Sequence, residues 1–222
     1  MLTLAVDTTA EFGSIALADS SGIRDEVLLH EPKGFSGALF GQIETLLARQ
    51  DLKIADIDLF AGASGPGSFT GVRIGLAAVK GLGEVLAKPV IAVSNLEALA
   101  SYGTEDLRAT VIDARRGEIF GALYDRSGAA IIPEMVIKFP RFLEMLANEQ
   151  FEWISTDFEP FQAAIADTPF ADYPITTAPR ALAPTIARIA MRRFAEGALS
   201  DPAAIEANYV RRSDAELLWK VC

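Results

Sequence analysis

The feature that most constrains the fold of this chain is an internal repeat. Asp113 lies 106 residues after Asp7, and each of the two follows an apolar, strand-like run and is trailed by a glycine. In the same gap-free alignment, Ala16-Leu17-x-Asp19 matches Ala122-Leu123-x-Asp125. Two unrelated β-hairpins would also give a few such matches, but an offset of about half the chain favours a duplication. We therefore expect two related α/β lobes with mixed sheets.

Hydrophobic patterning predicts the elements of these lobes. Residues 2–6, 14–18 and 23–31 form successive apolar or alternating runs with a Ser-Ser-Gly turn before the third, which predicts antiparallel strands. No low-complexity linker divides the chain, so we expect packed lobes at residues 1–104 and 105–222. Further strands are expected at 57–63, 88–94 and 153–155, and helices at 36–50, 71–87, from Ser94, at 140–149, at 159–166 and after Pro184.

Charge and hydropathy exclude several classes of protein. The formal net charge is −10, and Arg192/Arg193 and Arg211/Arg212 are only pairs, whereas a nucleic-acid-binding domain normally shows a clustered basic face. Any role with nucleic acid is therefore expected to run through a partner. Every apolar run is shorter than the ~20 residues that cross a bilayer, and Asp7 interrupts the stretch that a signal peptide would need. We expect a cytoplasmic protein with no membrane partner.

Residue types exclude several catalytic chemistries. His30 is the only histidine and Cys222 the only cysteine, so a histidine metal pair, a thiolate zinc site and an internal disulfide are all excluded. We expect no metal site and no catalytic residue. Asp7 and Asp113 keep one alternative open, because each ends an apolar strand and two lobes could aim these carboxylates at hydrated magnesium. The simpler interpretation is that each aspartate caps its own turn.

The stretch GASGPGSFTG at 62–71 raises the question of a phosphate site. It precedes an apolar helix, and amides near Gly65, Gly67, Ser68 and Thr70 could bind a phosphate there. It lacks the lysine of a Walker loop, and Thr70 stands where the dinucleotide-binding pattern needs its last glycine.

The helix at 71–87 favours a packing role for these glycines. Its charged residues, Arg73, Lys80 and Glu84, form one narrow stripe, so the helix is expected to bury more than one face. Gly71 and Gly75 lie four residues apart and would let another helix approach closely. Burial between two layers of its own lobe and burial in a subunit interface both explain this pattern, and the surplus of apolar surface favours the interface.

Four segments resemble one known family. LAVDTT near the start, GPGSFTGVRIG at 65–75, VIDARRGEIF at 111–120 and NYVR at 208–211 are similar to the TsaB family, which takes part in making threonylcarbamoyladenosine in bacterial tRNA. The resemblance runs through nearly all of the chain. It implies the duplicated actin/Hsp70-like ATPase fold, and it implies a relationship to TsaD, the transferase that modifies an adenosine beside the anticodon.

The resemblance also implies a role. TsaD carries a metal-binding histidine pair, whereas the corresponding KGFSGALFGQIE segment has none, and Phe35 stands closest to the single histidine that many TsaB sequences keep. The implied function is a non-catalytic subunit that binds and activates TsaD. The alternative is a stand-alone ATPase or phosphotransferase of the same fold that uses Asp7 and Asp113 with magnesium, and a peptidase is the weakest candidate. The chain has Asp7-Thr8-Thr9 where the actin-like phosphate signature has Asp-x-Gly, which argues against ATP hydrolysis.

Partners and site residues follow from the same resemblance. The implied partners are a TsaD-type subunit, a TsaE-type ATPase and a second copy of the chain, with tRNA reached only indirectly. No cofactor is expected, although a nucleotide at a subunit interface stays open. The expected partner-binding residues are Leu39, Ile43, Leu46, Gly71, Arg73, Ile74, Gly75 and Val79. If a vestigial phosphate or nucleotide site exists, its expected residues are Asp7, Gly65, Gly67, Ser68, Thr70 and Asp113.

Overall fold

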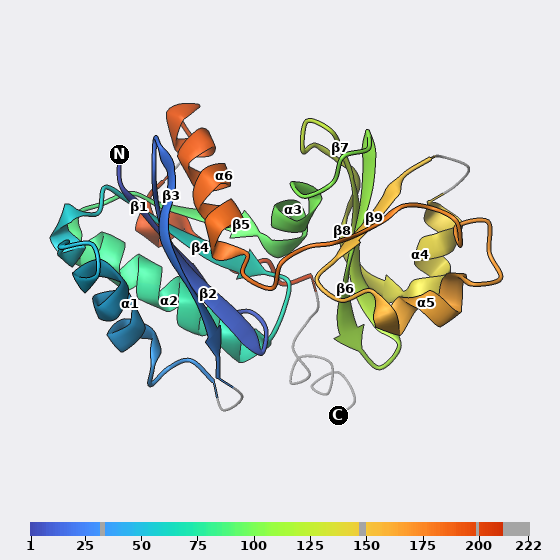
Figure 1. The fold of residues 1–222 in the computed structure, drawn as a ribbon, viewed down its shortest axis with the longest axis horizontal. Coiled ribbons are helices and arrows are strands. Elements are labelled where there is room, and N and C mark those ends of the chain that lie inside the picture. Colours follow the sequence, from blue (N-terminus) through green and yellow to red (C-terminus); the bar gives the residue numbers. More distant parts are fainter. Residues whose placement is uncertain (32–33, 147–149, 199, 211–222) are drawn as a thin grey trace, which may run out of the picture. The chain divides into compact units, whose positions relative to one another are not determined.

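The computed structural model describes residues 1–31, 34–146, 150–198 and 200–210. Figure 1 shows these residues as two sheets with helices. The chain forms two compact units. The first consists of Met1–Ala98 and Arg180–Asn208, and the second contains Leu99–Pro179 together with Tyr209 and Val210. Each unit is built around one five-stranded sheet.

The first sheet has the order β3-β2-β1-β4-β5. β1, β2 and β3 pair antiparallel, whereas β4 pairs parallel with β1 and β5 parallel with β4. The predicted antiparallel strands at the start of a mixed sheet are therefore confirmed. The strands are β1 (Thr3–Asp7), β2 (Phe12–Asp19), β3 (Gly22–His30), β4 (Leu59–Gly65) and β5 (Val90–Ser94).

The second sheet repeats this arrangement. Its order is β10-β9-β6-β7-β8, and the directions again change from antiparallel to parallel at the central strand. The predicted duplication into two α/β lobes with mixed sheets is confirmed. The strands are β6 (Leu107–Arg115), β7 (Glu118–Asp125), β8 (Ala130–Lys138), β9 (Glu152–Ser155) and β10 (Ile175–Thr177).

The duplication extends to single side chains. Asp19 Oδ1 accepts hydrogen bonds from the amide and hydroxyl of Ser21, and Asp125 Oδ1 accepts the same two bonds from Ser127. These bonds stabilise the ionised carboxylates, so they lower the pKa of Asp19 and of Asp125. Each aspartate thus closes the equivalent turn of its lobe.

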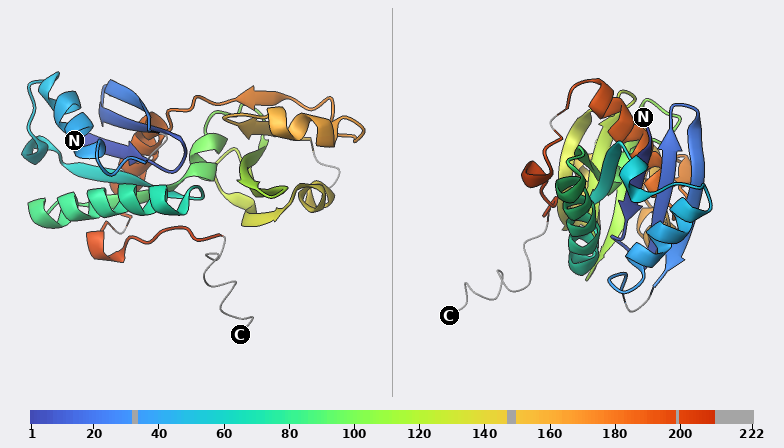
Figure 2. Two further views of the ribbon diagram at one scale, coloured as in Figure 1. Left: turned by 90° about the horizontal axis from the view of Figure 1, so that it is seen from below. Right: turned by 90° about the vertical axis from the view of Figure 1, so that its left-hand side faces the viewer.

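Helices cover both faces of the first sheet (Figure 2). The face that carries Leu4, Val6 and Ile15 shares one hydrophobic core with α1 (Leu39–Ala48) and α2 (Phe69–Leu86). The opposite face carries small residues, and there α6 (Ala183–Ala195) lies on β1, β2, β4 and β5. The amide of Ala183 donates to Ser14 Oγ at 3.0 Å. Strand periodicity explains this division, because alternate side chains point to opposite faces.

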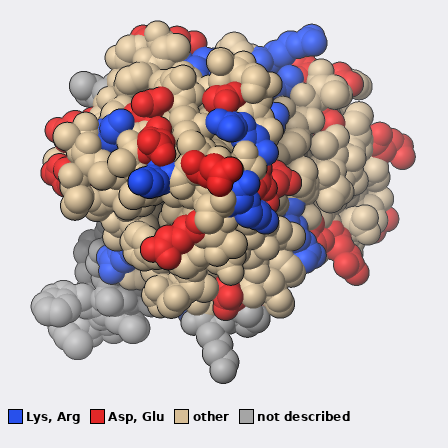
Figure 3. Space-filling view, turned by 60° about the vertical axis from the view of Figure 1, so that its left-hand side comes forward, with Lys and Arg blue, Asp and Glu red and all other residues tan. Residues whose placement is uncertain are grey.

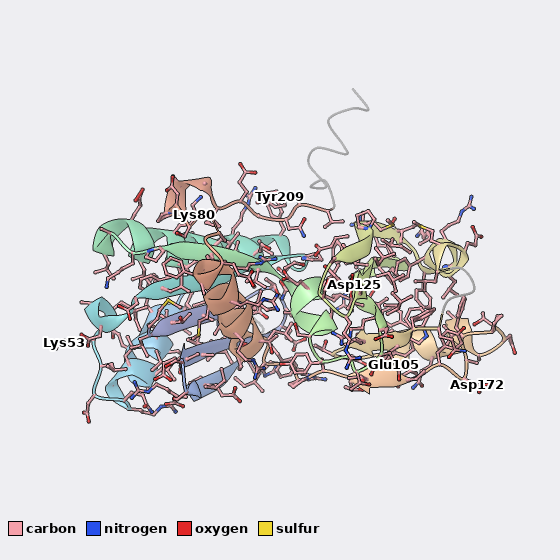
Figure 4. The ribbon with its side chains drawn as sticks, turned by 90° about the horizontal axis from the view of Figure 1, so that it is seen from above. Lys53, Lys80, Glu105, Asp125, Asp172 and Tyr209 are labelled. Atoms are coloured by element: carbon pink, nitrogen blue, oxygen red, sulfur yellow. The ribbon has the colours of Figure 1, made fainter. Side chains whose placement is uncertain are left out.

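The chain returns to the first unit near its end. A strap of residues 200–208 crosses α2 and includes the short helix η2 (Pro202–Ala204). Ser200 O accepts from the amide of Val90 at 2.8 Å, and the amide of Asn208 donates to Ser64 O at 2.8 Å. Lys80 extends from α2 to Ile205 O at 2.7 Å, and Figure 4 labels this lysine and Tyr209, which follows the strap.

The two units differ from the predicted lobes of 1–104 and 105–222. Residues 180–208 pack with the first unit because α6 and the strap cover its sheet and α2, and the chain enters the second unit at Leu99. The strap also explains part of the apolar surplus on α2: Pro202 approaches Gly83, and Ile205 and Ala207 pack against the hydrophobic core.

The second unit has an aromatic core. Phe142, Phe151 and Trp153 are fully or almost fully buried. Around them lie α4 (Phe139–Met145) and α5 (Glu159–Ile165), both near their predicted positions. The buried carboxylate of Glu152 accepts hydrogen bonds from the amides of Thr104 and Glu105 and so connects the start of this unit to β9.

The remaining short helices are η1 (Ile54–Asp56) and α3 (Asn95–Ala100). As predicted, Ser94 precedes α3, and its Oγ accepts from the amide of Leu96.

Candidate functional site

The candidate phosphate site lies at the carboxyl ends of β1, β4 and β5. This edge is where open α/β sheets commonly bind ligands. Asp7 ends β1, Gly65 ends β4, and Asn95 follows β5 directly. The glycine-rich turn then connects β4 to α2, with Ser68 as the N-cap residue, whose Oγ accepts from the amide of Gly71 at 3.3 Å.

Asp7 is buried in a closed hydrogen-bond network. Its Oδ1 accepts from the amide of Thr9 at 2.9 Å and from the hydroxyl of Thr9 at 2.7 Å, and its Oδ2 accepts from Asn95 Nδ2 at 3.3 Å. Burial raises the pKa of Asp7, and the hydrogen bonds from Thr9 and Asn95 oppose that rise. The carboxylate thus closes the turn after β1, as the simpler interpretation of the sequence expected.

Asn95 connects the three strand ends. Its Oδ1 accepts from the amide of Gly65 at 3.1 Å, while its Nδ2 donates to Thr9 Oγ1 at 2.8 Å as well as to Asp7. Sequence reasoning missed this residue. Its position straight after a parallel strand was the available signal, because side chains at such positions reach the shared edge of the sheet.

The glycines of the turn allow close packing inside the lobe. A Cβ atom on Gly67 would lie 2.4 Å from Thr9 O, and one on Gly71 would lie 2.0 Å from Thr8 O. A Cβ on Gly75 would lie 2.6 Å from Thr8 Oγ1. The amide of Ser68 donates to Thr9 O at 2.6 Å. The turn therefore holds the start of α2 against the loop after β1.

Asp113 repeats the local geometry of Asp7 in the second unit. Its Oδ1 accepts from the amide of Arg115 at 2.7 Å, two residues along, as Asp7 does from Thr9. Its Oδ2 lies 3.3 Å from a guanidinium nitrogen of Arg115, and its side chain is 35% exposed. Both aspartates therefore cap their own turns.

Most residues predicted for a partner surface are buried by their own chain. Leu39, Ile43, Leu46 and Val79 belong to the hydrophobic core, and Gly71 and Gly75 contact Thr8. They are not accessible to a partner. Of the eight predicted residues, only Arg73 is exposed, with its guanidinium 3.7 Å above the ring of Phe69, and Ile74 is half-buried.

The predicted phosphate-site residues divide in the same way. Asp7 and Gly65 are buried, Gly67 is half-buried, and Ser68 and Thr70 are exposed at the start of α2.

Phe35, which stands near the position of the family histidine, is buried, and its ring occupies the space above Gly13. The NYVR segment begins at Asn208 beside the glycine-rich turn, where its carbonyl oxygen would be 3.6 Å from a Cβ on Gly65. Arg211, Arg212 and Cys222 lie outside the described residues.

Two absences concern the described residues only. Within residues 1–31, 34–146, 150–198 and 200–210, no group of three or more His, Cys, Asp or Glu side chains is placed to hold a metal ion. In the same part of the chain, no helix is both long enough and apolar enough to cross a membrane.

Comparisons with known proteins give one family. The family model described as TsaD, tRNA N6-adenosine threonylcarbamoyltransferase, matches residues 33–216. A relative in Bacillus subtilis, named tRNA threonylcarbamoyladenosine biosynthesis protein TsaB, is 33% identical, with 67% of each chain covered. A relative of the same name in Escherichia coli is 32% identical, with 70% of each chain covered.

Solved structures agree. A Pseudomonas aeruginosa protein described as similar to peptidase YEAZ has a TM-score of 0.80 and 26% identity over 95% of this chain and 99% of its own. YeaZ from the same organism has a TM-score of 0.75 and 25% identity over 96% and 98%. The fold is the actin/Hsp70-like fold that the family resemblance implied, and its two lobes agree with the repeat. Motifs, duplicated topology and relatives agree that the chain belongs to the TsaB family.

Proposed function

We propose that this chain is a non-catalytic subunit that binds and activates a TsaD-type transferase in forming threonylcarbamoyladenosine in tRNA. Family membership supports the pathway, because this chain matches at least two thirds of the length of relatives that are named for threonylcarbamoyladenosine biosynthesis. The more specific part, an accessory rather than catalytic role, draws on the geometry of the first sheet. A cytoplasmic location, a TsaE-type ATPase in the assembly and a homodimer stay predictions.

The closed network around Asp7 is the observation that carries the accessory role. Both oxygens of Asp7 accept hydrogen bonds from Thr9 and Asn95, and the amide of Gly65 donates to Asn95. A phosphate or hydrated magnesium at this strand edge would have to displace these internal partners. Breaking a satisfied buried network costs roughly 1–3 kcal/mol for each group left unpaired. The geometry therefore favours a structural role for this edge.

The outer faces of α1 and α2 are the proposed surface for the partner. Phe40 on α1 is 53% exposed and Val85 on α2 is 85% exposed. Between Ile74 and Val85, α2 exposes the small residues Ala77 and Gly81 as well as the charged Glu84, and nothing lies within 4 Å of a Cβ on Gly81. Small and apolar residues at helical spacing let a second helix pack closely.

Charge on this chain fits recognition of tRNA through the partner. The net charge is −10. On the face that Figure 3 shows, lysines and arginines are interspersed with acidic residues and do not form a continuous basic patch. We therefore assign contact with the tRNA backbone to the partner, because phosphate contacts need clustered positive charge.

Reconstituted tRNA modification tests the proposal. The TsaD-type and TsaE-type partners, a supply of threonylcarbamoyl-adenylate and tRNA are combined with or without this chain. Product that forms only when the chain is added, with no ATP hydrolysis by the chain alone, supports the accessory role. Equal product without it refutes the role, and tight magnesium-dependent ATP binding by the isolated chain would favour the ATPase alternative.

A surface variant separates partner binding from folding. Ala77→Arg places a long charged side chain on the exposed face of α2, while Ala164→Arg makes the same change at an exposed position of α5 in the second unit. Both variants should fold as the unsubstituted chain does. Only Ala77→Arg should lose binding to the TsaD-type subunit and activation of it.

A further inference from the structure

The strands at the edges of the two sheets differ in how they are protected. The sheet orders place β3, β5, β8 and β10 at the edges, where unpaired backbone groups can pair with another extended segment. β3 carries the charged residues Arg24, Asp25 and Glu26. β8 contains Pro133, and β10 is only three residues long. Charge, proline and short length all oppose strand addition, so these three strands carry their own protection.

β5 lacks all three features. Its sequence VIAVS, from Val90 to Ser94, has neither a charged residue nor a proline, and short apolar stretches rich in β-branched residues readily pair with copies of themselves. The amide of Phe60 donates to Pro89 O, so the backbone of Pro89 faces β4. Backbone groups of successive residues point to opposite sides of a strand. Val90 and Ala92 therefore direct their N–H and C=O groups away from β4, at the outer edge.

Two contacts occupy this outer edge. The amide of Val90 donates to Ser200 O in the strap at 2.8 Å. Arg193, on α6, donates from Nη1 to Ala92 O at 3.0 Å. One donor and one acceptor of neighbouring outward positions are thus engaged by segments about a hundred residues further along the chain. Val90 is fully buried as a result.

The position of Arg193 shows that it serves the strand edge. Arginine in the last turn of a helix is commonly explained by the helix dipole, and such a residue would interact with the last carbonyls of its own helix. Arg193 instead bonds to Ala92 O on β5 and, through Nη2, to Glu97 Oε2 on α3 at 2.6 Å. Glu97 is buried, so it fixes the guanidinium beside β5.

The strap is attached to the first unit at both ends. Besides Ser200, the bond from Lys80 Nζ to Ile205 O holds its middle to α2, and the amide of Asn208 holds its end to Ser64 O. A short surface segment of this kind can open without unfolding the sheet beneath it. The strap is therefore the movable part of the cover, whereas α6 lies on the sheet itself.

We propose that the strap and Arg193 form a removable cover of β5, and that uncovered β5 pairs with β5 of a second copy of this chain. A second copy is the occupant because the same apolar strand on both molecules gives a self-complementary, two-fold contact. This inference is independent of the proposed function. It assigns to residues 200–208 the role of keeping the chain from associating through this edge.

Two matched double variants test the inference. Lys80→Met with Arg193→Gln, the cover variant, removes the bond to the middle of the strap and the bond to Ala92 O. Arg192 remains 4.0 Å from Glu97, so the buried carboxylate keeps a cationic neighbour. The control variant, Lys53→Met with Arg188→Gln, makes the same charge change at exposed positions before η1 and on α6.

Both variants are made in a chain that also carries Ala77→Arg, which blocks association through the outer face of α2. Analytical ultracentrifugation over a range of concentrations measures self-association. Hydrogen exchange measures the protection of the Val90 and Ala92 amides, and circular dichroism checks that each variant is folded.

The cover variant should behave differently from the control at both low and high concentration. In dilute solution the β5 amides should exchange at least about tenfold faster than in the control. At higher concentration the cover variant should associate at least about tenfold more tightly than the control, and its β5 amides should regain protection. Adding Ala92→Pro, which removes an outward N–H, should abolish this association.

Three results would overturn the inference. Unchanged exchange in β5 would show that the strap and Arg193 do not protect the edge. A cover variant that exposes β5 and stays monomeric, or that associates without protecting β5, would exclude pairing through this strand. If the double substitution prevents folding, Arg193→Gln alone is compared with Arg188→Gln alone by the same measurements and the same criteria.

Discussion

Adding one methyl group at Gly71 should show how tightly α2 is held against the loop after β1. A Cβ atom there would lie 2.0 Å from Thr8 O and 3.0 Å from the Thr8 carbonyl carbon, and both are backbone atoms that cannot rotate away. Non-bonded heavy atoms sit about 3.5 Å apart, so the helix must retreat by roughly 1.5 Å. That retreat also strains the bond from Thr8 Oγ1 to Gly71 O, which is 2.7 Å long.

The expected cost follows from these contacts. Overpacking costs about 1–3 kcal/mol and the lost hydrogen bond about 1 kcal/mol, while replacing a helical glycine by alanine returns at most about 1 kcal/mol. Gly71→Ala should therefore lower the free energy of unfolding by about 2–3 kcal/mol, which corresponds to a Tm lower by about 5–10 °C in a chain of this size.

Gly81→Ala is the matched control. It lies on the same helix, but nothing lies within 4 Å of its added Cβ. It should raise the free energy of unfolding by about 0.5–1 kcal/mol through helix propensity alone. Urea unfolding followed by circular dichroism measures both variants. If Gly71→Ala proves as stable as Gly81→Ala, the close contact between α2 and the loop after β1 is refuted.

Three further substitutions test other features of the structure. Asn95→Ala removes hydrogen-bond partners of Asp7, Thr9 and Gly65. The free energy of unfolding measured in urea should therefore fall by about 2–4 kcal/mol. An unchanged value would show that these hydrogen bonds do not stabilise the fold. Lys80→Met removes the bond to Ile205 O, and hydrogen exchange in residues 200–208 should quicken while exchange in the sheet stays the same. Burial alone would raise the pKa of Glu152, but its hydrogen bonds, with a nearby arginine, lower it, so its ionised form stabilises the fold. Glu152→Gln should therefore destabilise by about 1–2 kcal/mol at pH 7, and the difference from the unsubstituted chain should shrink as the pH falls below about 4.

The duplicated fold was predictable because local patterns determine it. The hairpin at Asp7 and its copy at Asp113 show the same order of apolar runs and turn residues, and such runs form strands wherever they occur. The closing turns at Asp19 and Asp125 depend on serines only two residues away. Features of this kind are visible in sequence because their partners are close along the chain.

Only part of the packing of α2 could be predicted from the sequence. Its apolar surplus was correctly recognised, but the sheet and the strap supply much of the cover. Lys80 donates a hydrogen bond to Ile205 O in the strap, and these residues are 125 positions apart. Sequence periodicity does not predict a pairing over such a distance. Asn95 escaped prediction for the same reason, since its partners Asp7 and Gly65 are brought to it only by the parallel strands.

The most direct test of the central claim is the rate of tRNA modification by the reconstituted TsaD-type enzyme as this chain is titrated in. We expect product formation to rise with the chain and to saturate near one copy for each catalytic subunit. Ala77→Arg should abolish the rise, whereas Ala164→Arg should preserve it. A rate that is independent of the chain would contradict the accessory role, and an Ala77→Arg variant that activates fully would contradict the partner surface on α2.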